Sequence, residues 1–176
     1  VVSFVNAGIL TLTQAIGVIM GANIGTTFTA WIIALFGFKA DISILAVPLM
    51  AAGFIMSISK KGKIKDIGEI VVGFSLLFLG LSFMKNSVPD LQSTPEALSF
   101  IQSWSGHGLW SILLFVAVGT VLTLVLQSSS ATVALTLIVL NMGWIKFDMA
   151  AAMVLGENIG TTITANIAAA VGNVNA

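Results

Sequence analysis

The sequence predicts an all-α membrane protein with inverted-topology repeats, a re-entrant hairpin and broken transmembrane helices. Three observations predict this fold class: apolar runs fill most of the chain, one polar string occurs twice, and another polar string interrupts an apolar run. The chain is 57% hydrophobic and 8% charged, with a mean hydropathy of +1.08. Soluble domains carry about 25% charged residues. This chain cannot cover a water-facing surface with charge, so we place it in a bilayer.

Charge and cysteine content exclude several classes of function. The net charge is zero and all seven basic residues are Lys, so the chain has no basic face for nucleic acid. It has no Cys, which excludes disulfides, zinc–thiolate sites and a thiol nucleophile. No acid–base–nucleophile arrangement suggests an enzyme. The chain opens on Val1 inside an apolar run, without a signal peptide, and we expect it to be an internal fragment of a longer membrane protein.

Five apolar stretches give the expected order of elements. They are residues 1–12, 14–38, 42–59, 67–84 and 109–171. A spanning helix needs roughly 20 residues, so most of these stretches can cross a membrane. Pro48 lies in the third stretch and predicts a mild kink, because neighbouring helices can satisfy the freed carbonyl.

Lysines give the expected orientation. Four of the seven, Lys60, Lys61, Lys63 and Lys65, lie in loop 60–66. The positive-inside rule places that loop in the cytoplasm. The links at 39–41 and 85–108 are then extracellular.

The outer segment 85–108 contains a predicted short helix. Ser93 or Thr94 is the expected cap and Pro95 the first helical residue. Leu98, Ile101 and Trp104 share one face, which suits a helix lying along the membrane interface. We expect His107 to be solvated, Lys146 and Asp148 to be interfacial, and four tryptophans to mark the membrane boundaries: Trp31, Trp104, Trp110 and Trp144.

Two segments 135 residues apart are copies of each other. Residues 3–30 and 138–165 align without a gap and share 11 of 28 residues, eight of them within ten positions. The shared core reads "GANIGTTFTA" in the first copy and "GENIGTTITA" in the second. With 39–41 outside, the first copy crosses from inside to outside. If the second copy crosses inward, the pair forms an inverted-topology repeat, which is typical of secondary transporters.

The string "QSSSATVAL" at 127–135 decides the direction of the second copy. If "QSSS" is the tip of a re-entrant hairpin, with arms 109–126 and 131–143, the second copy starts outside and is inverted. A single straight span over 109–143 would be about 35 residues, too long to cross once, and would make the copies parallel. We prefer the hairpin. By the same 135-residue offset, a first "QSSS"-like element is expected just before Val1.

These predictions divide the chain into four parts. Residues 1–38 hold a hairpin arm and a broken helix, and 39–84 hold two transmembrane helices joined by the cytoplasmic basic loop 60–66. Residues 85–108 form the extracellular loop, and 109–176 form the second repeat, with the QSSS hairpin and another broken helix.

The duplicated string is a poor continuous helix, because it combines Gly, Asn and β-branched Thr. A break there would free carbonyls for a sodium ion and N–H groups for an anion. The alternative is packing: Gly17, Gly21 and Gly25 are spaced as in helix-packing motifs, echoed by Ala152, Gly156 and Gly160. Packing explains those small residues but not the recurrence of Asn and Thr.

Glu157 stands where the first copy has Ala22. An acidic residue within a membrane segment is a functional candidate, and three roles stay open here: a cation ligand, a proton site, or an acid kept neutral. Alternatively, the Glu157 carboxylate has no such role and extends into a water-filled cavity.

The pairing of "QSSSAT" with a duplicated "GxNIGTTxTA" resembles the sodium-dependent phosphate cotransporters, bacterial type and animal type II. The resemblance implies a central site for Na⁺ and inorganic phosphate, and in bacterial relatives a cytoplasmic regulatory domain after the membrane part. Carried over to this sequence, the substrate-binding residues are Gln127, Ser128, Ser129, Ser130, Asn23, Thr26, Thr27, Asn158, Thr161 and Thr162. The sodium candidates are Gln127, Ser129, Thr27, Asn158, Thr162 and Glu157.

The expected function is sodium-coupled symport of inorganic phosphate across the plasma membrane, with Na⁺ as the coupling ion and no organic cofactor. The expected partners are phosphate, sodium and the lipid bilayer. Two alternatives remain. One is a cation-coupled symporter of another small anion, and the other is a membrane scaffold whose polar strings only hold helices together.

Overall fold

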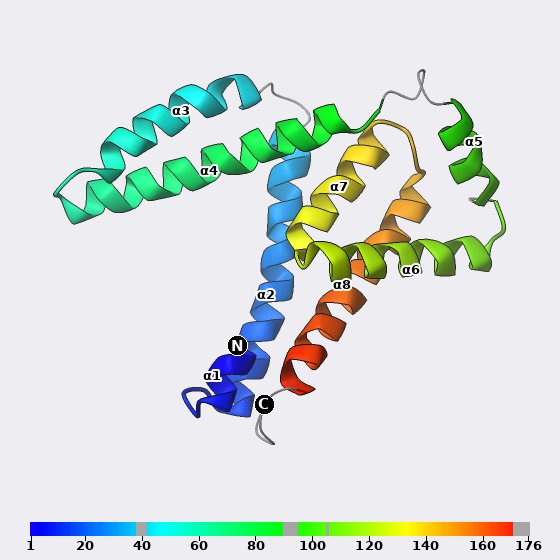
Figure 1. Cartoon of the computed structure of the whole chain (residues 1–176), viewed down its shortest axis with the longest axis horizontal. Helices are drawn as coiled ribbons and strands as arrows, with labels where there is room; N and C mark the ends of the chain where they lie inside the picture. The colour runs from blue at the N-terminus through cyan, green and yellow to red at the C-terminus, as the bar shows by residue number, and fades with distance from the viewer. Residues whose placement is uncertain (38–41, 90–94, 105, 171–176) are drawn as a thin grey trace. The chain divides into compact units, whose positions relative to one another are not determined.

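The computed structural model describes residues 1–37, 42–89, 95–104 and 106–170, and all regular structure within these ranges is helical. Figure 1 shows the helices in chain order. Their bounds are α1 (Val2–Asn6), α2 (Leu12–Ile32), η1 (Ile33–Gly37), α3 (Ile42–Ser57), α4 (Gly62–Ser87), α5 (Pro95–Trp104), α6 (Leu109–Leu126), α7 (Ser129–Asn141) and α8 (Phe147–Ala170). The helices fall into two units, Val1–Trp31 with Asp90–Ala176, and Ile32–Pro89.

The second unit is built on a helical pair, α3 and α4, which lie side by side (Figure 1). Two glycines allow the close approach. A Cβ added at Gly68 would lie 2.7 Å from the carbonyl oxygen of Gly53, so neither position has room for a side chain. Helix α3 runs through Pro48, as membrane helices with packed neighbours can.

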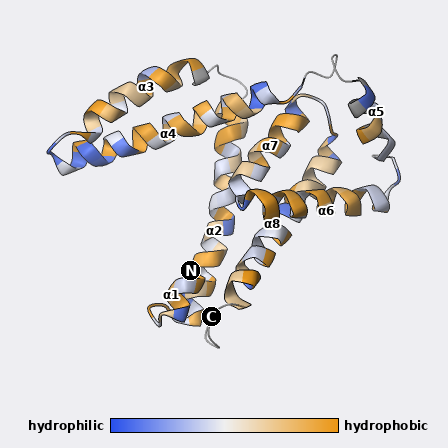
Figure 2. Cartoon of the chain, in the orientation of Figure 1, coloured by the Kyte–Doolittle hydropathy of each residue, from blue (hydrophilic) through white to orange (hydrophobic). Residues whose placement is uncertain are grey.

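The basic loop is shorter than predicted. Helix α4 begins at Gly62, so Lys63 and Lys65 lie in its first two turns and not in a loop over 60–66. Lys65 pairs with Glu69 one turn later, with 3.7 Å between Nζ and Oε1, and such a pair supports the helix start. The hydrophilic residues gather at the turn between α3 and α4 in Figure 2.

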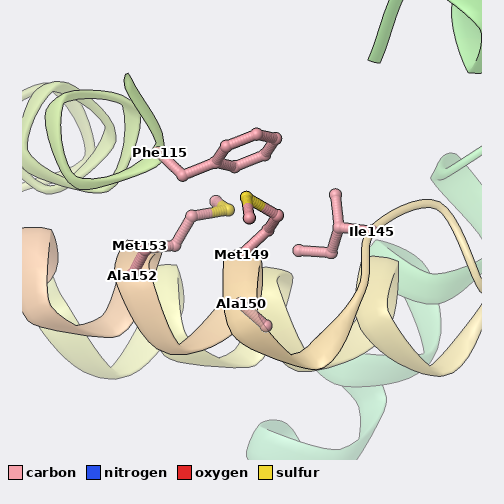
Figure 3. Packing of buried hydrophobic residues seen from close by; sticks show 6 residues of the cluster. All are labelled: Phe115, Ile145, Met149, Ala150, Ala152 and Met153. Atoms are coloured by element: carbon pink, nitrogen blue, oxygen red, sulfur yellow. The ribbon is translucent and has the colours of Figure 1, made fainter. Parts of the chain in front are cut away.

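The first unit has its core between α6 and α8. Phe115 of α6 packs over Met149, Ala152 and Met153 of α8, with Ile145 beside them (Figure 3). Glycines again set the distance between the helix axes. A Cβ added at Gly119 would collide with the carbonyl of Met153, and one at Gly156 with the carbonyl of Val116. This backbone contact fixes α8 against α6 at the start of the second polar string.

The sequence repeat is also a repeat of local structure. In each copy a helix ends at an Asn, Asn6 or Asn141, and the chain reverses at a glycine of positive φ. These glycines are Gly8 (φ 71°) and Gly143 (φ 79°). Most of the backbone bonds correspond: the Gly8 N–H donates to Val5 O at 2.9 Å, and the Gly143 N–H donates to Leu140 O at 3.0 Å. The loops preceding α2 and α8 therefore have the same fold.

Within the described part of the chain, three helical segments are long and apolar enough to cross a membrane. They are Leu12–Gly37, Gly62–Ser87 and Leu109–Leu126. Helix α6 is hydrophobic along most of its length (Figure 2). The chain is thus a helical multi-pass membrane protein. The side on which each loop lies, and the re-entry of 109–143, remain predictions.

Candidate functional site

The string "QSSS" forms the turn between α6 and α7. Helix α6 ends at Leu126, and Gln127 follows in the left-handed conformation (φ 53°, ψ 26°). Ser128 is extended and caps α7, because its Oγ accepts from the N–H of Ala131 at 3.3 Å. Its own O–H is then free to donate. The arms of the turn, α6 and α7, fall within two residues of the arms that the sequence predicts.

The two copies of the duplicated string lie on continuous helices, and the predicted breaks are wrong. Helix α2 runs through 21–30 and helix α8 through 156–165. The threonine hydroxyls bond within the continuous helix, although such bonds do not strengthen it. Each donates to the carbonyl four residues earlier: Thr26 to Ala22, Thr27 to Asn23, Thr29 to Gly25, Thr161 to Glu157, Thr162 to Asn158 and Thr164 to Gly160.

This bonding determines what the threonines can bind. A hydroxyl that donates to its own helix keeps only oxygen lone pairs for a ligand. Thr27 and Thr162 are exposed and fit this description. Lone pairs suit a cation and not phosphate. The free carbonyls that a helix break would have supplied are absent from both motifs.

A pocket of about 420 Å³ brings the two copies together. Asn23 of α2 faces Thr161 and Thr162 of α8 across it, and Asn166 lines it one turn further along α8. The remaining lining is apolar: Val1, Val2, Ile19, Ala22, Ala165 and Ala169. The polar side chains that line this pocket are therefore neutral amides and hydroxyls.

A hydrogen bond also ties the QSSS turn to the first copy. Thr26 Oγ1 lies 3.3 Å from Ser129 Oγ, and the two residues are 103 positions apart in the sequence. Because Thr26 Oγ1 also lies 3.2 Å from the carbonyl of Ala22, the Ser129 hydroxyl can donate to it. The first turn of α7 therefore lies beside α2. The N–H groups of Ser129 and Ser130 have no acceptor within α7, whereas those of Ala131 and Thr132 donate to Ser128.

The other predicted site residues have less contact with the pocket. Gln127, Ser128, Thr27 and Asn158 are exposed, and Ser130 is half-buried. None of these five lines the 420 Å³ pocket. Sequence reasoning missed Asn166, whose Nδ2 donates to Thr162 O at 2.9 Å. The signal was present, since Asn166 lies four residues after Thr162 and so shares its helix face.

Glu157 lies one turn before Thr161 on α8 but is not among the residues that line the pocket. Its side chain is 1% exposed, and Oε1 accepts a hydrogen bond from Thr136 Oγ1 of α7 at 2.7 Å. Helix α6 contacts the same turn, because Thr120 Oγ1 donates to Gly156 O at 2.9 Å. Glu157 is thus held among α6, α7 and α8 and does not reach a wet surface.

The packing explanation applies to only one copy in this chain. Gly156 and Gly160 pack against α6, whereas a Cβ added at Gly17, Gly21 or Gly25 meets nothing within 4 Å. Packing therefore accounts for the glycines of α8. It does not account for Asn23 and Thr27, which are exposed.

Comparison with known proteins gives one family. A family model described as Na⁺/Pi-cotransporter matches residues 1–86 and 101–175. The chain is 33% identical over 175 residues to "Uncharacterized protein YqeW" of Bacillus subtilis (strain 168), covering 98% of the chain and 53% of that protein.

Two further relatives carry a functional name. "Putative inorganic phosphate export protein YjbB" of Salmonella typhimurium and of Escherichia coli (strain K12) are each 28% identical over 166 residues, covering 94% of the chain and 29% of each protein. The chain thus spans about half the length of YqeW and less than a third of YjbB. No solved structure shows a significant match.

Proposed function

Because the chain belongs to the Na⁺/Pi-cotransporter family, which comprises transporters and not enzymes, we propose that it is part of a sodium-coupled symporter that imports inorganic phosphate across the plasma membrane. The observation that carries the proposal is the pocket between α2 and α8, where the two copies of the duplicated string contribute Asn23, Thr161 and Thr162. In this proposal the copies have opposite topology, with 60–66 cytoplasmic and 85–108 extracellular.

The hydrogen bonds divide the site by chemistry. Phosphate requires donors, and the O–H of Ser128, the N–H groups of Ser129 and Ser130 and the amide of Asn23 supply them in the proposal. Gln127, Ser130 and the amide of Asn158 complete this set in the proposal.

Sodium requires oxygen lone pairs. Thr27 and Thr162 offer them because their protons are used within the helix. The side-chain oxygens of Gln127, Ser129 and Asn158 are the other proposed ligands. Since no side chain that lines the pocket carries a positive charge, sodium and the α7 N-terminus together would balance the charge of phosphate.

The test is uptake of radiolabelled phosphate by the full-length protein in proteoliposomes, with an inward Na⁺ gradient or with choline in place of Na⁺. We expect uptake only with Na⁺. Thr162→Val should raise the sodium concentration for half-maximal uptake about tenfold, the usual cost of one lost polar contact. Ser87→Ala is the matched control, because the Ser87 hydroxyl also donates to the carbonyl four residues earlier, on α4.

Three outcomes would contradict the proposal. Equal uptake with choline would refute sodium coupling. Unchanged uptake in Thr162→Val and in Asn23→Ala, with lowered thermal stability, would favour the scaffold. Competition by sulfate or a dicarboxylate stronger than by unlabelled phosphate would indicate another small anion as substrate.

Export is the second candidate function, and the name of the YjbB relatives favours it. A symporter driven by an inward sodium gradient imports, so an exporter of this family needs a different driving force. Proteoliposomes preloaded with labelled phosphate separate the two. Phosphate efflux that is accelerated by external Na⁺, through exchange of entering Na⁺ for leaving phosphate, would favour export. Phosphate efflux that requires Na⁺ inside the proteoliposomes would favour symport.

A further inference from the structure

The buried carboxylate of Glu157 has an incomplete set of partners. Oε1 accepts from Thr136, but Oε2 is buried and accepts no hydrogen bond from any residue that the structure describes. Thr123 on α6 also has an unpaired buried oxygen. It is 1% exposed, and its Oγ1 lacks a hydrogen-bond partner within the described ranges. Buried polar atoms are nearly always paired, so two orphaned oxygens indicate a missing ligand.

Thr123 faces the turn of α8 that carries Glu157. A Cβ added at Gly160 would lie 2.8 Å from Cβ of Thr123 and 2.7 Å from O of Thr120. Thr120 in turn donates to Gly156. The segment 156–160 therefore lies against Thr120 and Thr123 on one side, and its Glu157 bonds Thr136 of α7 on another.

The charge of Glu157 has no counterpart. Helices α6, α7 and α8 contain no Lys, Arg or His, and the other acidic residue of α8, Asp148, lies nine residues away and is exposed. A buried carboxylate without a partner costs several kcal/mol, so this group either takes up a proton or binds a positive charge. The hydroxyl of Thr136 lies against it, and carboxylate and hydroxyl oxygens are the ligands that hard cations prefer.

We propose that Glu157, Thr136 and Thr123 form a buried sodium site between α6, α7 and α8, separate from the pocket shared by α2 and α8. Thr136 donates its proton to Oε1 and keeps its lone pairs for the ion. The site exists in one copy only, because the first copy has Ala22 at this position and Ala22 lines the pocket instead.

The location gives sodium a specific role. The ion would join the helix that follows the QSSS turn, α7, to the helix that carries Asn158 and Thr162, α8. Both helices contribute to the phosphate site, so sodium bound here would order that site before phosphate arrives. This role in transport rests on the proposed function, whereas sodium binding itself does not.

The test counts bound sodium. Purified full-length protein in detergent, without phosphate, is titrated with ²²Na⁺, and thermal stability is followed against NaCl and choline chloride. We expect Glu157→Gln to bind one sodium fewer than the wild type and to lose part of the Na⁺-induced rise in Tm. Asp148→Asn, which neutralises the exposed carboxylate of the same helix, should match the wild type.

Isosteric variants protect the test against misfolding. Thr123→Val and Thr136→Val remove one oxygen each and keep the shape, and each should weaken sodium binding at this site about tenfold. Equal sodium counts and affinities in the wild type and all three variants would overturn the site. A stabilisation that depends on pH but not on Na⁺, and disappears in Glu157→Gln, would also overturn it by identifying the occupant as a proton.

The outcomes separate this site from the proposed function. A wild type that binds the Glu157-dependent sodium but takes up no phosphate would retain the site and refute the transport proposal. Sodium-driven phosphate uptake with identical sodium counts in the wild type and Glu157→Gln would retain the transport proposal and refute the site.

Discussion

Gly21 and Gly156 are equivalent residues of the two copies, yet their surroundings differ. A Cβ at Gly156 would collide with the carbonyl of Val116, whereas one at Gly21 meets nothing within 4 Å. The same glycine in the same string is thus a packing requirement in one helix and a helix-weakening residue in the other. The environment of a residue, and not its identity, decides what its substitution costs.

This pair makes a controlled stability prediction. Gly156→Ala should destabilise the chain by about 1–3 kcal/mol, because the new methyl group overpacks the contact between α6 and α8. Gly21→Ala should stabilise it slightly, by about 0.5–1 kcal/mol, because Ala is the better helix former. Thermal unfolding in detergent, followed by circular dichroism, measures both. A Gly156→Ala variant as stable as Gly21→Ala would contradict the close contact.

At this scale the sequence identifies residue types better than their partners. The recurrence of Asn23, Thr27, Asn158 and Thr162 could be read from the repeat alone. The bond between Thr136 and Glu157 could not, because nothing in the apolar pattern of α7 marks which threonine faces α8. Thr123 is equally hidden, since buried threonines are unremarkable until their partners are known.

At the scale of helices, the turn between α6 and α7 contains a residue in a strained backbone conformation. Gln127 adopts the left-handed conformation, which is unfavourable for any residue with a Cβ. Its position between two apolar helices gives it no structural advantage over Gly. A non-glycine residue kept in this conformation suggests that its side chain has a function.

Two substitutions separate strain from function. Gln127→Gly removes both the side chain and the strain, and should stabilise the protein by about 1 kcal/mol relative to Gln127→Ala, which keeps the strain. Both variants should lose most phosphate uptake, because both lack the amide. Tm and uptake are measured on the same two preparations. If Gln127→Gly transports like the wild type, the amide has no part in the site.

Helix boundaries show where local pattern is sufficient. Pro95 begins α5 as predicted, and the proposed caps Ser93 and Thr94 lie outside the described residues. The QSSS turn was predicted because four polar residues interrupt an apolar run. The helix breaks in the duplicated string were predicted from propensity, and they are wrong, since both helices are continuous and each threonine bonds within its own helix. Propensity alone is a weak predictor of such breaks.

For the whole molecule, the repeat has consequences that no single helix has. Both copies consist of a helix, a glycine loop with mostly the same backbone hydrogen bonds, and a long helix. Duplicated local structure shows that the copies fold alike. It does not give the direction in which each crosses the membrane, because local hydrogen bonds are the same in either orientation. The inverted arrangement therefore depends on the lysine-rich turn and the parity of the crossings.

Equivalent positions before α2 and α8 test the inversion directly. Thr11 and Lys146 are 135 residues apart, both are exposed, and each immediately precedes its long helix. The chain contains no Cys, so Thr11→Cys and Lys146→Cys can be introduced singly into a full-length protein freed of other cysteines. A membrane-impermeant thiol reagent should label Lys146→Cys from outside intact cells and Thr11→Cys only in inverted vesicles. Lys61→Cys and Ser103→Cys report the expected inner and outer sides. Labelling of both test positions from one side would mean parallel copies. The chain between them would then cross the membrane an even number of times, with 109–143 crossing once instead of turning back at Gln127.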